Sequence, residues 1–159
     1  MKRETFYTGL YGPEALRGEL QMMLGTIPRI IGNGTIPDYK LTFSCRRGGG
    51  IVPSMEPAQG KELPLMVFHL EYYELRRLER RLGYPMGIRR ATFDGLIEGI
   101  HPERIVTYYV PLNRAHGAPS DGLYEQMRRL YQENAWDEDG LIEAIQFSAT
   151  ETPKIKRIK

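Results

Sequence analysis

The chain has 159 residues, a hydrophobic fraction of 41%, a charged fraction of 26% and a formal net charge of +2. These values are those of a single globular domain, which can bury a core without disulfides or a structural metal. The small net charge gives no electrostatic reason to expect nucleic acid as a partner, and the single cysteine, Cys45, excludes an intramolecular disulfide and a multi-cysteine zinc site.

The sequence carries no signal for a membrane or for secretion. It has no apolar stretch long enough to span a bilayer, and its start, Met1-Lys2-Arg3-Glu4, lacks the apolar core of a signal peptide. We therefore expect a cytoplasmic protein that does not bind membranes. We expect one domain over residues 1–150 and a basic, flexible tail over residues 151–159.

The N-terminal segment predicts a strand that turns sharply into a helix. Thr5–Tyr7 favours a short strand, Gly9 and Gly12 mark a turn, and a helix is expected over residues 14–24. Pro13 lies just inside the start of that helix, where proline is favoured. Such a corner exposes backbone N–H groups to which an anion can bind, although a plain tight turn explains the same residues.

A turn, a strand and a glycine-rich loop follow. Asn33-Gly34 is typical of a turn, and residues 38–43 alternate as a strand does. The next residues, Arg46 and Arg47, precede three consecutive glycines, which predict a loop with close backbone approach. These two arginines are candidates for contact with an anion, although arginines in loops are more often solvated.

The central segment, residues 63–90, contains the most regular patterns of the chain. Leu63–Leu70 is almost continuously apolar, which predicts a strand covered on both faces. The period then becomes helical over Glu71–Leu82, and Gly83 ends the helix. Its predicted inward residues are Leu75, Leu78 and Leu82, and its outer face carries Arg76, Arg77, Arg80 and Arg81. The arginines are expected to be solvated and paired with neighbouring glutamates, or to form an anion site.

The C-terminal third predicts two strands and two helices. Strands are expected over residues 89–93 and 105–110, with a turn at Asp94-Gly95. Ser120 is a good cap for a helix over residues 121–133, and a short last helix follows it.

The order of these motifs resembles that of the gamma-glutamylcyclotransferase (AIG2-like) family. Phe6-Tyr7-Thr8-Gly9-Leu10-Tyr11 is similar to the family's Y-G-S/T-x-L loop, and Leu78-Glu79-Arg80-Arg81-Leu82-Gly83 is similar to its L-D-x-x-E-G segment. Pro119-Ser120 and Tyr124 resemble its P-S-x-x-Y helix with one extra residue. The resemblance implies an α+β fold, a small mixed β-barrel of about five to seven strands with flanking helices.

Members of this family make the α-amine of a substrate attack its γ-carbonyl, which releases 5-oxoproline and an amine. That reaction needs a carboxylate to carry a proton from the attacking to the leaving amine. Leu82 stands where the family has its catalytic glutamate, and Glu79 stands where the family has an aspartate. The resemblance therefore implies the fold without the usual base, and Glu79 is the best substitute catalytic residue in the chain.

The resemblance also implies a ligand site around the N-terminal corner. Arg89 falls close to a position where the family has a pocket tyrosine, so its guanidinium is expected to select an anionic ligand. The implied ligand-binding residues are Thr8, Gly9, Leu10, Tyr11, Gly12, Leu82, Arg89 and Tyr124. We expect no cofactor and no metal, because the three histidines and Cys45 have no metal-ligand spacing.

Three hypotheses follow from the sequence. The first is a protein that binds a small molecule, anionic or gamma-glutamyl-like, and lacks cyclotransferase activity. The second is a divergent enzyme that cleaves a gamma-glutamyl-like amide through Glu79 or an acid from elsewhere in the chain. The third is an interaction module that binds an acidic protein through the Arg76–Arg81 face; nucleic acid is not expected.

Overall fold

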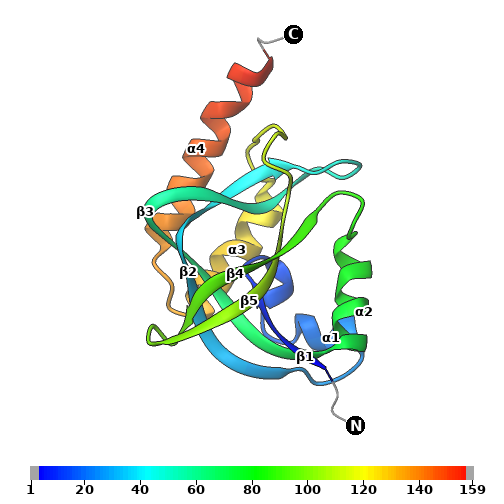
Figure 1. The fold of residues 1–159 in the computed structure, drawn as a ribbon. Coiled ribbons are helices and arrows are strands. Elements are labelled where there is room, and N and C mark those ends of the chain that lie inside the picture. The colour runs from blue at the N-terminus through cyan, green and yellow to red at the C-terminus, as the bar shows by residue number, and fades with distance from the viewer. Residues whose placement is uncertain (1–3, 157–159) are drawn as a thin grey trace.

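The chain forms a closed β-barrel with helices on its outside (Figure 1). The computed structural model describes residues 4–156, and of residues 151–156 it describes the backbone alone. The order around the barrel is β1-β3-β2-β4-β5. The strands are β1 (Thr5–Leu10), β2 (Arg29–Cys45), β3 (Ile51–Glu71), β4 (Arg89–Ile97) and β5 (His101–Tyr109).

One long hairpin and one parallel contact build the barrel. β2 and β3 pair antiparallel along nearly their whole length around the loop at residues 46–50. β1 lies antiparallel to β3, and it closes the barrel through a parallel contact in which Thr8 lies opposite Val106 of β5. In the closed barrel the six-residue β1 lies between β3 and β5, and the chain passes from its end at Leu10 directly into the first helical turn.

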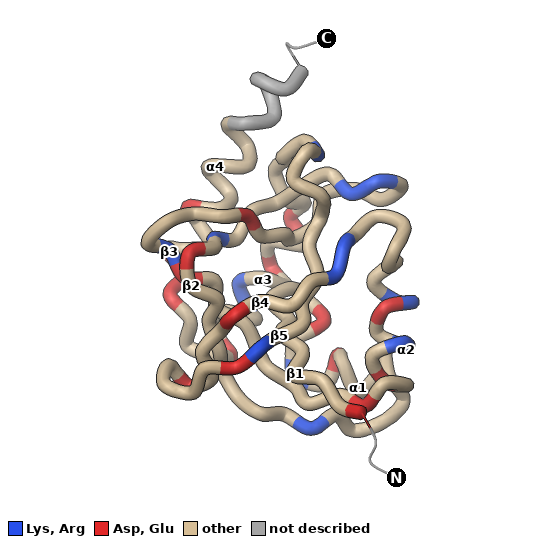
Figure 2. Tube along the Cα trace, viewed as in Figure 1, with Lys and Arg blue, Asp and Glu red and all other residues tan. Residues whose placement is uncertain are grey.

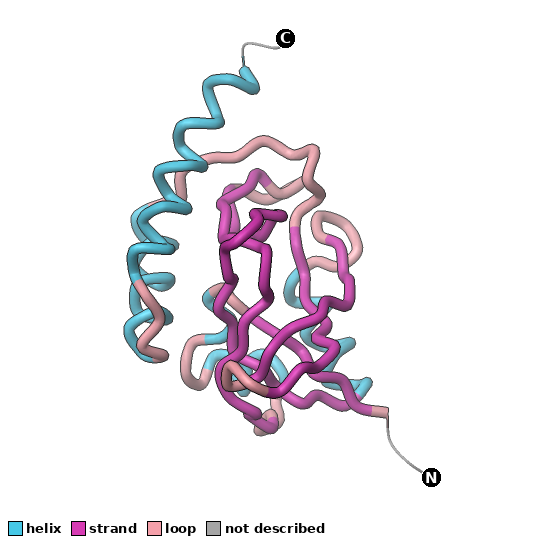
Figure 3. The backbone as a smooth tube through the Cα atoms, turned by 60° about the vertical axis from the view of Figure 1, so that its left-hand side comes forward, coloured by secondary structure: helices cyan, strands magenta, loops and turns pink. Residues whose placement is uncertain are grey.

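The helices lie around the barrel (Figure 3). A short 3₁₀ helix, η1, and α1 follow β1, α2 connects β3 to β4, and α3 and α4 end the chain. Their bounds are η1 Pro13–Ala15, α1 Glu19–Leu24, α2 Tyr72–Leu82, α3 Asp121–Glu133 and α4 Glu138–Lys156. No helix within residues 4–156 is long and apolar enough to cross a membrane.

The core is centred on the apolar run that the sequence predicted as a strand. Leu63, Leu65 and Val67 of β3 are completely buried, whereas Met66 between them is only half-buried. This alternation shows that the strand has one face inside the barrel and a second, partly covered face. The prediction of a strand is confirmed, and the predicted cover on its second face is partial, since Phe68 is buried and Met66 is half-buried.

The ends of α2 and α3 follow the predicted chemistry. Glu71 and Glu74 form a capping box at the start of α2, and Gly83 ends it in the left-handed conformation with φ 86°. At α3, the Ser120 hydroxyl oxygen accepts a hydrogen bond from the Leu123 N–H at 3.2 Å. Both predicted helices are confirmed: the predicted stop ends α2, and the predicted cap begins α3.

Two predicted turns lie inside strands instead. Gly34 belongs to β2, where an added Cβ would lie 2.7 Å from Val67 Cγ2. Gly95 belongs to β4, where an added Cβ would lie 2.6 Å from Ile105 Cδ1. Both glycines therefore make room for side chains that fill the barrel, and the two turn predictions are wrong.

The predicted helix over residues 14–24 is divided in two. The backbone leaves η1 at Leu16 with ψ 147°, and Gly18, with φ 83°, precedes α1. At the other end, the backbone of α4 is helical as far as Lys156, where the sequence predicted a flexible tail from residue 151. The rest of that predicted tail, residues 157–159, lies outside the described residues.

Candidate functional site

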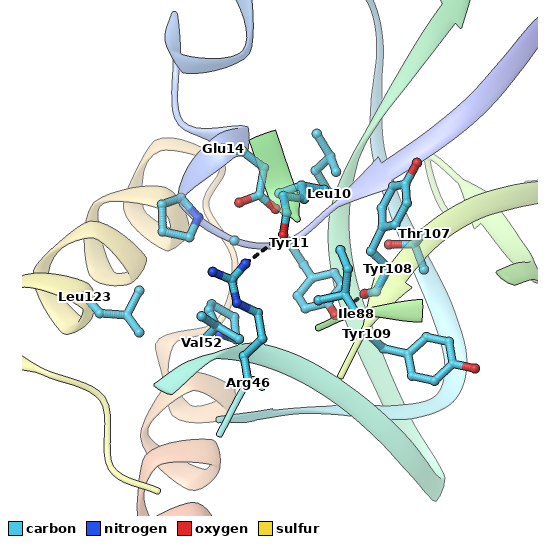
Figure 4. Close-up of a pocket in the computed structure, with 14 residues that line it drawn as sticks. Leu10, Tyr11, Glu14, Arg46, Val52, Ile88, Thr107, Tyr108, Tyr109 and Leu123 are labelled. Atoms are coloured by element: carbon cyan, nitrogen blue, oxygen red, sulfur yellow. Dashed lines mark hydrogen bonds between the residues drawn. The ribbon is translucent and has the colours of Figure 1, made fainter. Parts of the chain in front are cut away.

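A cavity of about 190 Å³ lies where β1 ends (Figure 4). It is enclosed by the corner after β1, the start of β3, the end of α2, β5 and α3. Its walls are mostly apolar, and Glu14 and Arg46 are the charged residues in them. The lining residues are Leu10, Tyr11, Gly12, Pro13, Glu14, Arg46, Val52, Pro53, Leu82, Ile88, Thr107, Tyr108, Tyr109 and Leu123. An apolar cavity with a few polar groups is the usual form of a small-molecule site.

The corner that forms one wall is fixed to the opposite strand. Tyr11 is buried, and its hydroxyl group donates a hydrogen bond to the backbone oxygen of Tyr108 in β5 at 2.5 Å. Burial, together with the nearby charge of Glu14, raises the pKa of Tyr11 well above its usual range, so the phenol keeps its proton. This bond therefore joins the corner after β1 to β5 across the cavity wall.

Glu14 projects from η1 toward the cavity (Figure 4). An added Cβ on Gly12 would lie 3.0 Å from Glu14 Oε2, so the carboxyl group folds back over the corner. Burial raises the pKa of Glu14, and hydrogen bonds from the backbone of Glu14 and Gly12 oppose that rise. The backbone groups that the sequence analysis offered to an external anion thus already face a carboxyl group of the chain itself.

Arg46 enters the cavity from the loop between β2 and β3. Its Nη1 donates a hydrogen bond to the backbone oxygen of Leu82 at 2.7 Å, and within the described residues its buried Nε has no hydrogen-bond partner. An added Cβ would lie 2.6 Å from Arg46 Cγ at Gly87, 2.8 Å from Nη2 at Gly49 and 3.2 Å from Nη1 at Gly83. Three glycines therefore leave the space through which the Arg46 side chain passes. The guanidinium group uses only part of its hydrogen-bonding capacity.

Leu82 is the last residue of α2 and lines the cavity with its half-buried side chain. The sequence analysis placed the family's catalytic glutamate at this position by resemblance. At this part of the wall the chain has an apolar group beside the guanidinium of Arg46. A leucine here cannot accept or donate a proton.

Glu79 lies one helical turn before Leu82 and is not among the lining residues. It is buried, and its Oε2 accepts hydrogen bonds from Arg90 Nη1 at 2.5 Å and from the Tyr108 hydroxyl group at 2.8 Å. The Arg90 guanidinium also lies 4.8 Å from the centre of the Tyr84 ring. Burial first, and the bond to Glu79 second, raise the pKa of Tyr108, so this phenol remains a donor. Glu79 is thus held by two partners in the wall behind the cavity.

The structure brings only part of the predicted ligand site together. Leu10, Tyr11, Gly12 and Leu82 line the cavity. The other four predicted ligand-binding residues, Thr8, Gly9, Arg89 and Tyr124, are not among its lining residues.

Each of these four has a structural reason to lie elsewhere. Thr8 and Gly9 lie inside β1, where an added Cβ on Gly9 would lie 2.8 Å from Leu65 Cδ2. Arg89 is exposed at the start of β4, and Tyr124 is half-buried on α3, where the preceding residue, Leu123, lines the cavity instead.

Sequence reasoning missed the two groups that give the cavity its polarity. The sequence pattern favours a solvated loop position for Arg46 and gives no functional signal for Glu14. The signals were present in the glycines that surround Arg46 and in the position of Glu14 directly after Gly12-Pro13. No group of three or more His, Cys, Asp or Glu side chains among the described residues could hold a metal ion.

Comparison with known proteins gives matches at the level of structure. No protein-family model and no curated protein matches the sequence. A solved gamma-glutamyl cyclotransferase superposes with a TM-score of 0.75 at 17% identity, over 83% of this chain and 81% of that chain. The uncharacterized protein loc79017 from Homo sapiens gives 0.73 at 17% identity, over 82% of this chain and 80% of that chain. YkqA from Bacillus subtilis gives 0.70 at 19% identity, over 98% of this chain and 54% of that chain.

These similarities define the fold class. Residues 4–156 form a mixed five-stranded β-barrel with four α-helices, the gamma-glutamyl cyclotransferase-like fold. The predicted fold class is therefore confirmed. At identities below 20% the likeness concerns the fold, and a function has to be argued from the cavity itself.

Proposed function

We propose that the protein binds a small carboxylate-bearing molecule with an apolar body in this cavity, and that it lacks the cyclotransferase base. The observation that supports this most directly is the contact between Arg46 and Leu82, the last residue of α2. The Arg46 guanidinium projects into an apolar cavity beside Leu82, the residue at which the resemblance implies a catalytic glutamate. The cavity has a cationic group and an apolar wall where the resemblance implies an acid.

The chemistry of the walls sets the kind of ligand. A carboxylate that accepts hydrogen bonds from a guanidinium group forms one of the stronger polar contacts in proteins, and an apolar surrounding strengthens it further. Val52, Ile88 and Leu123 offer aliphatic contacts to the rest of the molecule. The cavity, at about 190 Å³, is below the range of roughly 300–1,000 Å³ that is typical of drug-sized ligands. A short, branched carboxylate fits these conditions.

Calorimetric titration with isovalerate, 4-methylvalerate and 5-oxoproline tests this function, with isovaleramide as the uncharged control ligand. Arg46→Gln should weaken binding of the best carboxylate at least about tenfold, or about 1.4 kcal/mol, and leave binding of the amide nearly unchanged. The matched control is Arg47→Gln, because Arg47 is exposed in the same loop and does not line the cavity. Equal affinities in the two variants, or no binding of any of the three carboxylates, would refute the proposal.

Glu14 supports a second candidate function, cleavage of a gamma-glutamyl-like amide. In that reaction the substrate's α-amine attacks its γ-carbonyl, and a carboxyl group takes the proton of the attacking nitrogen and returns it to the leaving amine. Glu14 faces the cavity, and burial raises its pKa above that of an ordinary glutamate, as is common for carboxyl groups at functional sites. This alternative predicts that the native chain releases 5-oxoproline from gamma-glutamyl amides and that Glu14→Gln abolishes the release.

A further inference from the structure

The outer face of α2 carries four arginines whose charge the helix does not balance. The two glutamates of α2 turn inward. Glu74 Oε2 accepts a hydrogen bond from the Thr26 hydroxyl group at 2.7 Å, and Glu79 is bound by Arg90 and Tyr108. The outer arginines, Arg76, Arg77, Arg80 and Arg81, are exposed and form no ion pair within the described residues. The expected pairing of this face with Glu74 and Glu79 is therefore wrong.

Two of these arginines are held in place by neutral partners. Arg76 Nη1 donates a hydrogen bond to the Tyr72 hydroxyl group at 3.0 Å, and Arg77 Nη1 donates to the backbone oxygen of Leu24 at 2.6 Å. Each guanidinium carbon lies 5.8 Å from the centre of a tyrosine ring, Tyr72 for Arg76 and Tyr73 for Arg77. The positive charges are thus partly fixed but remain open to an anionic partner.

Exposed apolar side chains flank the same face. Tyr72 and Tyr73 are 51% and 47% exposed at the start of α2, and Ile27 is 81% exposed. The bonds from Thr26 to Glu74 and from Arg77 to Leu24 bring the loop that carries Ile27 alongside the helix. Figure 2 shows the basic positions of α2 along the edge of the molecule. The surface combines positive charge with an aromatic and aliphatic border.

We infer that the outer face of α2, with Tyr72, Tyr73 and Ile27, is a docking surface for an acidic segment of a partner protein. Carboxylates on the partner would complement the charge of the arginines, and apolar side chains on the partner would cover Tyr72, Tyr73 and Ile27. Arginine and tyrosine are enriched in protein interfaces and lysine is depleted. The helix α2 contains four arginines and two tyrosines but no lysine. The net charge of only +2 and the aliphatic Ile27 argue for protein over nucleic acid.

Fluorescence anisotropy of the full chain with a labelled random copolymer of glutamate and tyrosine tests this inference. Polyglutamate and oligothymidylate serve as the comparison polymers. The native chain should bind the copolymer more tightly than either of these, and an increase in salt from about 50 to 200 mM should weaken the binding severalfold. Arg80→Glu with Arg81→Glu should reduce the affinity at least tenfold, because neither side chain supports the fold through a hydrogen bond in the described structure.

The control variant is Arg128→Glu with Arg129→Glu, an adjacent arginine pair on α3 with the same change of net charge. It should change the affinity less than twofold. Three results would overturn the inference: no binding of the copolymer by the native chain, equal losses in the two double variants, or tighter binding of oligothymidylate than of the copolymer. The last would assign the surface to nucleic acid.

Discussion

Two groups of polar residues near the cavity each contain a glutamate and an arginine, but only one of them forms an ion pair. In the first group the buried Glu79 accepts hydrogen bonds from the Tyr108 hydroxyl group and from Arg90, whose side chain is 38% exposed. Glu14 and Arg46 line one cavity, but the described structure has no ion pair between them, and each is bound by backbone groups. The difference teaches that, in this chain, the half-buried acid and arginine that leave each other unpaired are the ones that can still bind a ligand.

The largest effect should come from breaking the satisfied cluster. Glu79→Gln removes the charge that holds both Arg90 and Tyr108, and charge-assisted bonds of this kind support a loss of about 3 kcal/mol in unfolding free energy. Urea unfolding measures it. Glu125→Gln is the control, because Glu125 pairs with Arg128 at the surface and should change stability by less than about 0.5 kcal/mol. An unchanged stability for Glu79→Gln would contradict the structural role that its two hydrogen bonds indicate.

A smaller loss should follow from disturbing the path of Arg46. In Gly87→Ala the new Cβ would meet Arg46 Cγ at 2.6 Å and the Arg47 backbone oxygen at 3.0 Å. We expect a loss of about 1–3 kcal/mol in urea unfolding and weaker binding of the best carboxylate. Gly122→Ala, in α3, meets nothing within 4 Å and should stabilise the chain by up to about 1 kcal/mol. An unchanged carboxylate affinity in Gly87→Ala would contradict a direct contact between Arg46 and the ligand.

The helices and strands could be predicted from the sequence, but the meeting of Glu14 and Arg46 at the cavity could not. α2 and α3 follow from an apolar period that agrees with Gly83 and Ser120 at their ends. Gly34 and Gly95 were misassigned as turns, because a glycine that makes room for Val67 or Ile105 looks the same in a sequence as a glycine that turns the chain.

Glu14 and Arg46 could not be placed together by periodicity. They come from separate loops, and the closure of the barrel brings both loops to the end of β1. The position of Leu82 could be predicted, because a helical wheel and the family resemblance both indicate that its side chain points inward. It lines the cavity as expected.

The smallest effect should be a pH dependence that arises from Glu14. Its folded pKa is raised above the ordinary value of 4.5, so the unfolded chain loses this proton first as pH rises. Unfolding free energy should therefore fall as pH rises from about 4.5 through the raised pKa, and then level off. In Glu14→Gln this fall should disappear, as urea unfolding across pH 4 to 9 would record, whereas Glu19→Gln, at an exposed site in α1, should follow the native curve. Parallel stability curves for all three chains would contradict the raised pKa of Glu14.

Release of 5-oxoproline from a panel of gamma-glutamyl amines and peptides tests the central claim most directly, with the native chain, Leu82→Glu and Glu14→Gln assayed side by side. The account predicts no release by the native chain or by Glu14→Gln, and release by Leu82→Glu, which restores a carboxylate to the cavity wall beside Arg46. Release by the native chain that Glu14→Gln abolishes would contradict the account and make Glu14 the working acid of an enzyme.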